Sequence, residues 1–226
     1  MSETSLTRRP WRARTTSRGT TLRRRSTPRH RRTTMKLYAI AAVDQANGIG
    51  LDGSIPWRIK QDMRQFKEKT TGRGVVMGRR TWESLGGVRL AKRYNMVLTS
   101  DPGKVNGADF VAGDIHEAIQ QAEDIGLSEL WIIGGTRVYW DGLGQLDGLY
   151  LTIVEGDYKC DTHFVKLIEK GWTIVTSSHA PAKDGEPAHT YVHLAPRPSS
   201  PLLGSHPVAT NAEDASFWLP SLGAQP

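Results

Sequence analysis

The clearest indication of the fold lies in residues 130–136, which read Leu130-Trp131-Ile132-Ile133-Gly134-Gly135-Thr136. The run of apolar residues predicts a short buried strand, and the paired glycines predict its end. A helix is expected from about Thr136. A strand that leads through a glycine turn into a helix is typical of α/β domains with a parallel sheet.

The same order of elements extends in both directions from this stretch. Further strands are predicted at residues 37–43, 75–77, 96–99, 149–154, 172–177 and 190–194. Helices are predicted at residues 62–70, from about residue 81, and at 115–125, where Asp114 is a candidate N-cap. We therefore expect one α/β domain at residues 35–197, with a mostly parallel central sheet, flanking helices and a C-terminal antiparallel hairpin.

Two segments outside that domain differ from it in composition. Residues 1–34 hold eleven arginines, one acid and many Ser and Thr residues, which is typical of a disordered extension. Residues 198–226 are rich in Pro, Ser and Ala and are interpreted as a C-terminal tail. Residues 1–34 carry a net charge of +10. The whole chain carries +7, so residues 35–226 carry −3. The basic balance therefore describes the extension and not a face of the domain.

Three accounts of residues 1–34 stay open. The plainest is that translation starts at Met35. A basic arm that contacts nucleic acid or another polyanion is the second, and it is the one place where nucleic-acid contact is expected. An organellar transit peptide is the third, because such segments are rich in Arg and Ser and poor in acids. The few apolar residues (Leu6, Trp11 and Leu22) make a poor amphipathic face and weigh against that third account.

Cysteine and apolar content bound the cellular setting. Cys160 is the only cysteine and cannot form an internal disulfide, so a reducing compartment fits, and we expect the cytoplasm. No apolar run approaches the ~20 residues that a membrane-spanning helix needs, so no membrane partner is expected. A monomer is expected. With 226 residues the chain is long enough for one substantial core.

Residues 48–53 match the G-x-G-x-x-G pattern of dinucleotide-binding folds and follow a predicted strand. That fingerprint opens directly into a helix, whereas residues 54–57 (Ser-Ile-Pro-Trp) intervene here. It also needs an acid about 20 residues further on, at the end of a second strand, and none is found. A mobile glycine-rich loop that covers a site is the better interpretation.

Asp62 is the carboxylate of most interest. It lies on the first turn of a predicted helix, one turn before Phe66 and shortly after Trp57 and Ile59. Apolar neighbours predict a partly desolvated carboxylate, which suits ligand binding or proton transfer. The alternative is an Asp that only complements the positive end of the helix dipole. Spacing alone does not separate these two interpretations.

Two strand ends carry residues that suit phosphate. Gly134-Gly135 leaves bare backbone between a strand and a helix, where amides can approach phosphate oxygens. Residues 78–81 (Gly-Arg-Arg-Thr) repeat the arrangement with two guanidiniums, which bind phosphate through paired hydrogen bonds. A tight turn and a pair of solvated arginines are the plainer alternatives. Two such ends in one sheet favour a dinucleotide that carries an additional phosphate.

Taken in order, these motifs resemble the dihydrofolate reductase family, from Met35 to about Leu194. The resemblance covers the whole predicted domain and neither terminal segment. Asp62 falls five residues after Trp57, where the family has its single acidic active-site residue. The stretches that carry the resemblance are residues 35–44, 47–50, 55–57, 62, 76–84, 132–135, 138–139, 151–152, 161–164 and 191–194.

The resemblance implies an oxidoreductase that reduces 7,8-dihydrofolate to 5,6,7,8-tetrahydrofolate by hydride transfer from NADPH, supporting one-carbon metabolism and thymidylate synthesis. It implies that Asp62 binds the pterin amino group and N3 and favours protonation at N5. Thr152 is implied to orient that carboxylate, and Trp57 to help hold a water beside the pterin. The implied substrate contacts are Tyr38, Asp62, Met63, Phe66, Arg93 and Ile133.

The resemblance also implies a cofactor site. Ala42 and Ile49 are expected to flank the nicotinamide, and Gly134 and Gly135 are expected to be joined by a cis peptide bond. Arg79, Thr81 and Ser100 are implied to hold the adenosine phosphates, with Arg79 selecting the 2′-phosphate. The implied cofactor contacts are Ala42, Ile49, Gly50, Gly78, Arg79, Arg80, Thr81, Ser100, Gly134, Gly135, Arg137, Val138 and Tyr139.

One stretch departs from the family pattern. The family has a proline-containing segment before the arginine that binds the glutamate tail of folate, but residues 86–93 contain no proline and are one residue longer. Arg93 is the expected partner of the tail carboxylate, and Arg89 is the alternative. The neighbouring Arg80 replaces a more usual polar or basic residue and is expected to strengthen the phosphate contact.

Two other functions compete with this one. The pyrimidine reductase of riboflavin synthesis shares the fold and NADPH but lacks the pairing of Trp57 with Asp62. A non-catalytic protein whose working part is the Arg-rich extension has no need of Asp62 or of Gly134-Gly135. No metal is expected, because the histidines at 163, 179, 189 and 193 have no metal-ligand spacing.

Overall fold

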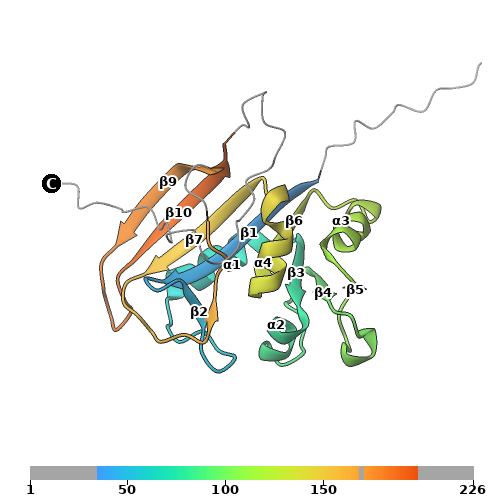
Figure 1. Ribbon diagram of the computed structural model, residues 1–226, viewed down its shortest axis with the longest axis horizontal. Helices are drawn as coiled ribbons and strands as arrows, with labels where there is room; N and C mark the ends of the chain where they lie inside the picture. The colour runs from blue at the N-terminus through green and yellow to red at the C-terminus, as the bar shows by residue number, and fades with distance from the viewer. Residues whose placement is uncertain (1–34, 168–170, 198–226) are drawn as a thin grey trace, which may run out of the picture. The chain divides into compact units, whose positions relative to one another are not determined.

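The computed structural model describes residues 35–167 and 171–197. The predicted extension at residues 1–34 and the predicted tail at 198–226 lie outside the described residues. Within the described ranges the chain alternates strands and helices around one large sheet (Figure 1).

The central sheet has eight strands in the order β5-β4-β3-β6-β1-β7-β10-β9. Six of them run parallel, whereas β10 is antiparallel to both β7 and β9. This confirms the mostly parallel sheet and the C-terminal antiparallel hairpin. The eight strands are β1 (Lys36–Asp44), β3 (Gly74–Gly78), β4 (Tyr94–Leu98), β5 (Phe110–Ala112), β6 (Glu129–Gly134), β7 (Gly148–Val154), β9 (Trp172–Ala180) and β10 (His189–Pro196).

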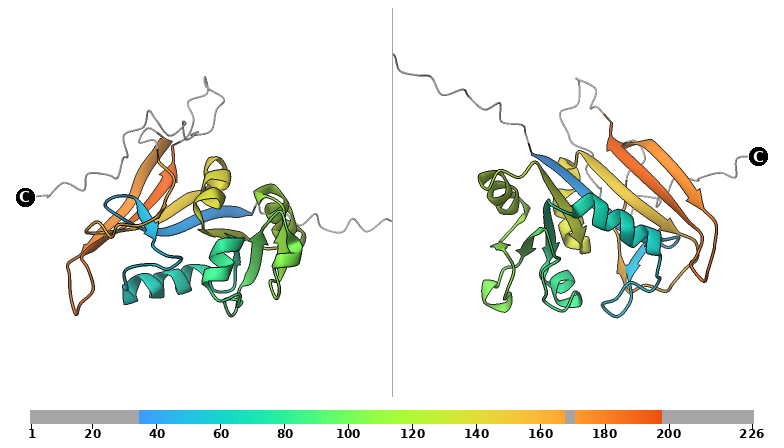
Figure 2. Two further views of the ribbon diagram at one scale, coloured as in Figure 1. Left: turned by 60° about the horizontal axis from the view of Figure 1, so that its bottom comes forward. Right: turned by 180° about the vertical axis from the view of Figure 1, so that it is seen from behind.

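Helices cover both faces of this sheet, and a small second sheet joins two loops. In the left panel of Figure 2, α1 and α2 lie on one side of the sheet and α4 lies on the other. The small sheet pairs β2 (Gly48–Gly50) with β8 (Thr162–His163). The helices are α1 (Lys60–Thr70), α2 (Arg79–Ser84), α3 (Ile115–Asp124) and α4 (Thr136–Gly142), with short 3₁₀ turns at Pro102–Lys104 and Leu143–Gln145.

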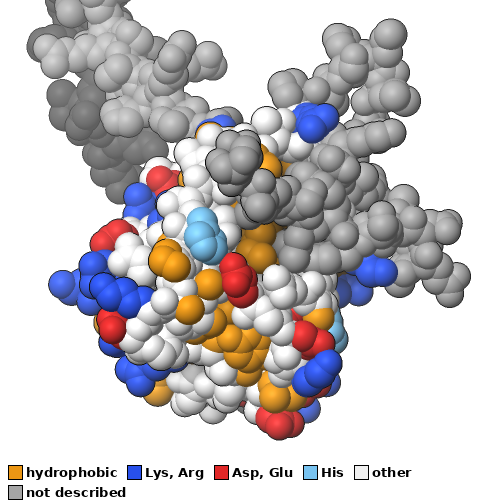
Figure 3. Space-filling view, turned by 90° about the vertical axis from the view of Figure 1, so that its left-hand side faces the viewer, with side chains coloured by type: hydrophobic (Ala, Val, Ile, Leu, Met, Phe, Trp, Pro, Cys, Tyr) orange, Lys and Arg blue, Asp and Glu red, His pale blue; other side chains and the backbone are white. Residues whose placement is uncertain are grey.

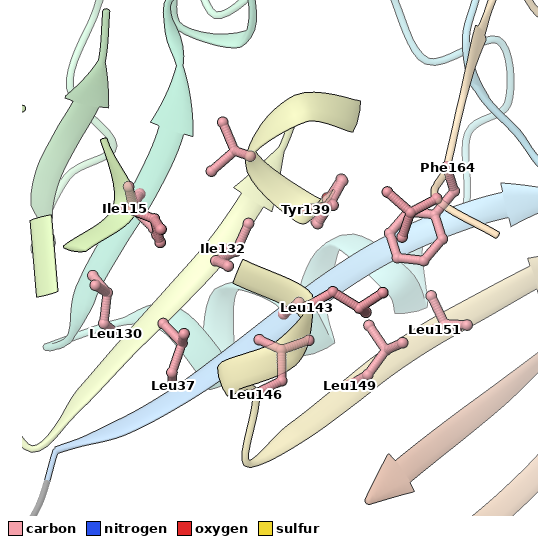
Figure 4. Close-up of a cluster of buried hydrophobic side chains, with 14 of the residues drawn as sticks. Leu37, Ile115, Leu130, Ile132, Tyr139, Leu143, Leu146, Leu149, Leu151 and Phe164 are labelled. Atoms are coloured by element: carbon pink, nitrogen blue, oxygen red, sulfur yellow. The ribbon is translucent and has the colours of Figure 1, made fainter. Parts of the chain in front are cut away.

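Strand β1 shows how the sequence divides the core. Because successive side chains of a strand point to opposite faces, its residues join two different clusters. Leu37, Ala39 and Val43 pack with α3, α4 and the segment around Phe164 (Figure 4). Ile40 packs in the second cluster, where Phe66 of α1 contributes. A near-continuous apolar run is therefore what a strand covered on both faces requires.

The helices begin where local chemistry favours it. Asp114 is the N-cap of α3 and accepts a hydrogen bond from the backbone N–H of Glu117, as the sequence predicts. Helix α1 has no side-chain cap but carries Asp62 in its first turn and lysines in its last, in agreement with the helix dipole.

In the described ranges, no helix combines the length and apolarity that crossing a membrane takes.

Several predicted boundaries are wrong by a few residues. Helix α1 begins at Lys60 and not at 62, and α2 begins at Arg79 and not at about 81, directly after β3. Strands β9 and β10 are each longer than predicted. The short strands β2, β5 and β8 were not predicted, because two or three residues are too few to show a hydrophobic period.

Both signs of charge are mixed on the described surface. On the face that Figure 3 shows, basic and acidic side chains are interspersed around an apolar stretch. Surface ion pairs such as Lys36–Asp147 (2.6 Å) and Arg89–Asp109 (2.7 Å) fit this mixture. The described domain therefore does not present a uniformly basic surface on this face.

Candidate active site

The parallel strands bring their carboxyl ends to one edge of the sheet. Strands β3, β6, β1 and β7 end there at Gly78, Gly134, Asp44 and Val154. In open α/β sheets, ligands bind at this edge. The predicted site residues on different strands are therefore brought to a common region, although they lie far apart in sequence.

Asp62 is paired with Thr152, which lies 90 residues further along the chain. The Thr152 hydroxyl donates a hydrogen bond to Asp62 Oδ1 over 2.5 Å, and Thr152 is itself 4% exposed. Burial raises the pKa of Asp62 above its ordinary value, while the Thr152 hydrogen bond and the charge of His189 limit that rise. The carboxyl therefore keeps a proton to higher pH than a solvated aspartic acid does.

A cavity of about 330 Å³ lies between α1 and the strands β7 and β10, and Asp62 and Thr152 line it together with Ile40 and Tyr191. A larger cavity of about 530 Å³ lies beside the amino-terminal halves of β1 and β6 and does not include Asp62. The smaller cavity is the better candidate for chemistry, because it holds the only pairing of a carboxyl with raised pKa and an oriented donor among the described residues.

Apolar side chains surround the approach to Asp62. Phe66 and Ile133 pack in one cluster with Ile40, next to the cavity. Met63, the neighbour of Asp62 on α1, is 56% exposed. Sequence reasoning did not single out two more apolar side chains that are exposed after α2: Leu85 and Val88. The signal that could have found them is an apolar residue within a polar loop.

Trp57 is buried beside α1 and leaves one polar atom without a partner. It is 8% exposed and clusters with Ile59 and Val154, and its ring centroid lies 5.0 Å from that of Tyr158. Its indole Nε1 is buried and has no hydrogen-bond partner among the described residues. A buried indole N–H normally donates to some acceptor, so this atom marks a place for a polar partner.

The two arginines proposed for the glutamate tail have different surroundings. The guanidinium of Arg93 lies 5.6 Å from the Phe66 ring centroid and donates to Thr70 Oγ1 and the Ala91 carbonyl oxygen. Arg89 instead forms an ion pair with Asp109 at 2.7 Å. Arg93 is therefore the one held beside the apolar wall of the site, and burial lowers its pKa.

Tyr38 lies apart from Asp62. Its ring packs against Trp131 and Tyr150, with centroid distances of 4.8 and 6.0 Å, and it lines the larger cavity. Both Tyr38 and Ile40 point to the same face of β1, but Ile40 is the one that lines the cavity of Asp62. The structure thus places Tyr38 in one apolar cluster with Phe66 and Ile133, but not in the cavity that Asp62 lines.

Glycines at the ends of β3 and β6 form a cradle of bare backbone. The Gly134–Gly135 peptide bond is cis, as the resemblance implies. A Cβ at Gly134 would lie 3.2 Å from Thr81 Oγ1, and one at Gly78 would lie 3.2 Å from Val138 and 3.8 Å from Gly135 N. Side chains at these positions would fill the space, so glycine keeps it open.

The predicted phosphate-binding side chains lie next to this cradle, and some are already paired. Gly78 at the end of β3 pairs with Leu98 at the end of β4. Arg79 and the exposed Ser100 come shortly after these two strand ends, so they lie at the same edge of the sheet. Arg79 forms an ion pair with Glu83 at 2.6 Å, and Arg80 is exposed. Arg137 is paired with Asp141.

Two predicted cofactor residues have buried side chains. Val138 and Tyr139 are each 4% exposed and belong to the main core cluster. The Tyr139 hydroxyl donates to the Ile40 carbonyl oxygen, and burial together with the charge of Asp62 raises its pKa. Ala42 packs against the Trp57 cluster, whereas Ile49 packs against the main core.

The glycine-rich loop after β1 is anchored by Asp44, which sequence reasoning missed. This carboxylate is fully buried and accepts hydrogen bonds from the backbone N–H groups of Ala46, Gly48 and Tyr158. A Cβ at Gly48 would lie 2.4 Å from that of Cys160. Gly50 is held by the N–H of Asp161, whose carboxylate accepts from Asp52 N. The loop therefore packs on residues 157–163.

Comparisons with known proteins agree with this geometry. The profile of a family described as dihydrofolate reductase matches residues 36–195. Dihydrofolate reductase type 3 of Salmonella typhimurium is 39% identical over 151 residues, 66% of this chain and 91% of that protein. Dihydrofolate reductase of Bacillus subtilis is 33% identical over 157 residues, 69% and 90% of the two chains. A solved structure of Enterococcus faecalis dihydrofolate reductase with NADP(H) and RAB-propyl has a TM-score of 0.68 at 30% identity and covers 72% of this chain and 97% of that one.

Proposed function

The chain belongs to the dihydrofolate reductase family and reduces 7,8-dihydrofolate to 5,6,7,8-tetrahydrofolate with NADPH, and we propose that Asp62 is the acid on which this reaction depends. The observation that carries the proposal is the hydrogen bond from Thr152 to a carboxyl whose pKa burial raises. A carboxyl in such a place can bind the pterin and hold a proton near the pH at which the enzyme works.

Asp62 has one oxygen committed to Thr152 and a second oxygen free to accept hydrogen bonds. That second oxygen suits the amino group and N3 of the pterin, which are both donors. Binding there favours protonation of the pterin at N5. Phe66 and Ile133 supply the apolar walls that position the ring. The unpartnered Nε1 of Trp57 supports its proposed role of holding a water molecule beside the pterin.

The residues at the cradle fit a dinucleotide with an extra phosphate. Bound NADPH supplies the hydride. Gly134 and Gly135, with Thr81, would let the diphosphate approach the backbone closely. Arg79, Arg80 and Ser100 lie at the adjacent strand ends, where guanidiniums can bind the 2′-phosphate. Ala42 belongs to β1, and Ile49 and Gly50 belong to β2. We propose that these three residues contact the nicotinamide side.

A direct assay tests the substrate. The purified full chain is mixed with NADPH and dihydrofolate, and absorbance at the nicotinamide band is followed. We expect oxidation of NADPH with dihydrofolate and none with a ribosylated pyrimidine substrate. Turnover of the pyrimidine and not of dihydrofolate would assign the chain to the pyrimidine reductases, and turnover of neither would remove the enzymatic role.

A matched pair of variants tests the glutamate-tail contact. We expect Arg93→Gln to raise the KM for dihydrofolate about tenfold or more, because a charge-assisted pair with a carboxylate is lost. Arg89→Gln should leave that KM unchanged, since Arg89 is occupied by Asp109. The affinity for NADPH, measured by fluorescence quenching, should be unchanged in both. A reversed pattern would move the tail site to Arg89.

Three finer assignments are also proposals. We propose a monomer, which light scattering on the purified chain tests. A cytoplasmic location is supported by the free thiol of Cys160, since reducing compartments keep such thiols unpaired. Contact with a polyanion is proposed only for residues 1–34, and retention on heparin that disappears when those residues are removed would support it.

A further inference from the structure

Four rings form a row on the face of the sheet where α1 lies (Figure 2). Trp131 of β6 is opposite Tyr38 of β1, and Tyr150 of β7 is opposite His193 of β10. The ring centroids are 4.8 Å apart for Tyr38 and Trp131, 6.0 Å for Tyr38 and Tyr150, and 4.1 Å for Tyr150 and His193. A Cβ at Gly148, opposite Tyr38, would lie 3.2 Å from the Tyr38 ring. The glycine therefore leaves room for this aromatic floor.

The cavity of about 530 Å³ described above lies on this floor, with Tyr38, Trp131 and Tyr150 among its lining residues. Small-molecule sites in proteins are typically about 300–1,000 Å³, so its volume is in the range of a ligand site. Helix α1 supplies the polar side of the lining. The residues that line both this cavity and that of Asp62 are Gln61, Gln65, Lys69 and Tyr150.

Helix α1 turns different side chains toward the two cavities. Positions 61, 65 and 68 lie in one stripe along the helix and line the larger cavity. Asp62, Phe66 and Thr70 lie in the adjacent stripe. Arg93, the proposed partner of the glutamate tail, donates to Thr70 Oγ1 on that second stripe. The proposed path of dihydrofolate from Asp62 to Arg93 therefore leaves the larger cavity available to another molecule.

Lys69 is a cation placed over the aromatic floor. Its Nζ lies 3.9 Å from the centroid of the Tyr150 ring. The ion pairs of the described residues do not include Lys69. Burial lowers the pKa of Lys69, so its ammonium group is partly desolvated and would gain from a bound anion.

The other charged groups of this cavity are already paired or in solvent. Arg73 forms an ion pair with Glu129, and the same carboxylate accepts a hydrogen bond from Trp131 Nε1. Glu68 is exposed, so solvent and salt screen its charge. The cation of Lys69 is therefore the charge that a ligand on the aromatic floor would meet.

We propose that the larger cavity is a second ligand site, distinct from the site of reduction, and that it takes a planar aromatic carboxylate. The aromatic ring packs on Tyr38 and Trp131, and the carboxylate pairs with Lys69. The side-chain amides of Gln61 and Gln65 can donate further hydrogen bonds to it. The distinction between the two sites rests on the proposed function, whereas the choice of ligand rests on the lining of this cavity.

Three probes of one shape and different charge test the ligand class. The full chain is dialysed to equilibrium against 2-naphthoate, against the neutral 2-naphthalenemethanol, or against the cationic 2-naphthylmethylamine. We expect the carboxylate to bind about three- to tenfold more tightly than the alcohol, and the amine to bind most weakly. Any order in which the carboxylate is not the tightest ligand, or absence of binding by all three, would overturn the proposal.

Variants on α1 test the pairing. Lys69→Gln should weaken 2-naphthoate about three- to tenfold and leave the alcohol unchanged, because only the carboxylate uses the charge. Lys69→Arg keeps a cation and should keep the preference for the carboxylate. Lys67→Gln is the matched control, since Lys67 is exposed on the same helix and lines neither cavity. Equal weakening of both probes by Lys69→Gln would contradict the pairing, and thermal unfolding shows which variants are folded.

The position of the site is tested on the wild-type chain, without variants. With saturating dihydrofolate and NADP⁺, which supplies no hydride, the affinity for 2-naphthoate should change by less than about twofold, because the sites are separate. Nuclear Overhauser effects should join naphthoate protons to ring protons of Tyr38 and Trp131. Displacement by dihydrofolate, or effects only to other residues, would overturn the proposal. Failure of the proposed function would look different, because NADPH would not be oxidised with dihydrofolate while 2-naphthoate still bound.

Discussion

Asp44 and Asp62 are two carboxylates in the same domain, and their surroundings are opposite. Asp44 is fully buried at the end of β1 and accepts hydrogen bonds from three backbone N–H groups at 2.6–3.0 Å. Asp62 is half-buried on the first turn of α1 and accepts one hydrogen bond, from the Thr152 hydroxyl. The first carboxylate is occupied by the protein's own chain, whereas the second has capacity left for a ligand.

The difference explains why one residue is structural and the other is suited to chemistry. The donors of Asp44 belong to the loop after β1 and to the segment at Tyr158, so the carboxylate ties two loops together. Donors in that number offset the cost of burying a charge. One donor does not, and burial accordingly raises the pKa of Asp62. A group that is incompletely satisfied by the fold is available to the substrate.

The largest effect is expected from Asp62→Asn, which keeps the shape and removes the acid. We expect kcat to fall roughly 10²- to 10³-fold at neutral pH, because general acid–base assistance is lost. The residual activity should rise as pH falls, since solvent then protonates the pterin directly. Steady-state rates between about pH 5 and 9 check this. Full activity at neutral pH would show that Asp62 has no such role.

Asp44→Ala should affect stability where Asp62→Asn affects rate. It leaves three backbone N–H groups without their acceptor, and we expect a loss of roughly 3 kcal/mol in the free energy of unfolding. Urea unfolding measures that loss. The KM for NADPH should rise as well, because the loop at residues 46–50 loses its anchor, while kcat at saturation changes less. An unchanged stability would contradict the anchoring role of Asp44.

Thr152→Val should remove the one hydrogen bond that Asp62 accepts, and so make Asp62 still less like Asp44, which accepts three. The lost hydrogen bond lowers the pKa of Asp62 in the wild type, so its removal raises that pKa further and moves the alkaline fall of kcat to higher pH. The maximal rate should fall about fivefold, because the carboxylate is no longer oriented by a bond worth about 1 kcal/mol. Thr152→Ser retains the donor and is the control. A shift to lower pH would reverse the argument.

The smallest effect concerns stability against pH. Because the pKa of Asp62 is raised in the folded state, its contribution to stability is present at low pH and is lost as pH rises through the folded pKa. The variant Asp62→Asn does not show this pH-dependent loss of stability, because the asparagine side chain does not titrate. The free energy of unfolding of the variant should therefore gain on the wild type as pH rises from below the ordinary value of 3.8 toward neutrality. Urea midpoints at several pH values measure the difference, and a constant difference would contradict it.

Residue patterns in the sequence predicted the strands and helices that are long enough to show a period. The run at residues 37–43 indicated β1, and Asp114 indicated the start of α3. Asp62 was singled out from its apolar neighbours, but spacing could not separate a functional acid from one that serves the helix dipole. The role of Thr152 was predicted only from the family resemblance, because no residue near Thr152 in the sequence indicates contact with a residue 90 positions earlier.

The sequence by itself determined the alternation of elements, the glycine turns at strand ends and the family, because these depend on neighbours along the chain. Only the tertiary structure decided which carboxylate is occupied and which is available. Asp44 meets Tyr158 across 114 positions, and Tyr191 reaches the cavity of Asp62 through the pairing of β10 with β7. The proton affinity of a side chain is set by groups within a few ångströms, and folding alone chooses those groups.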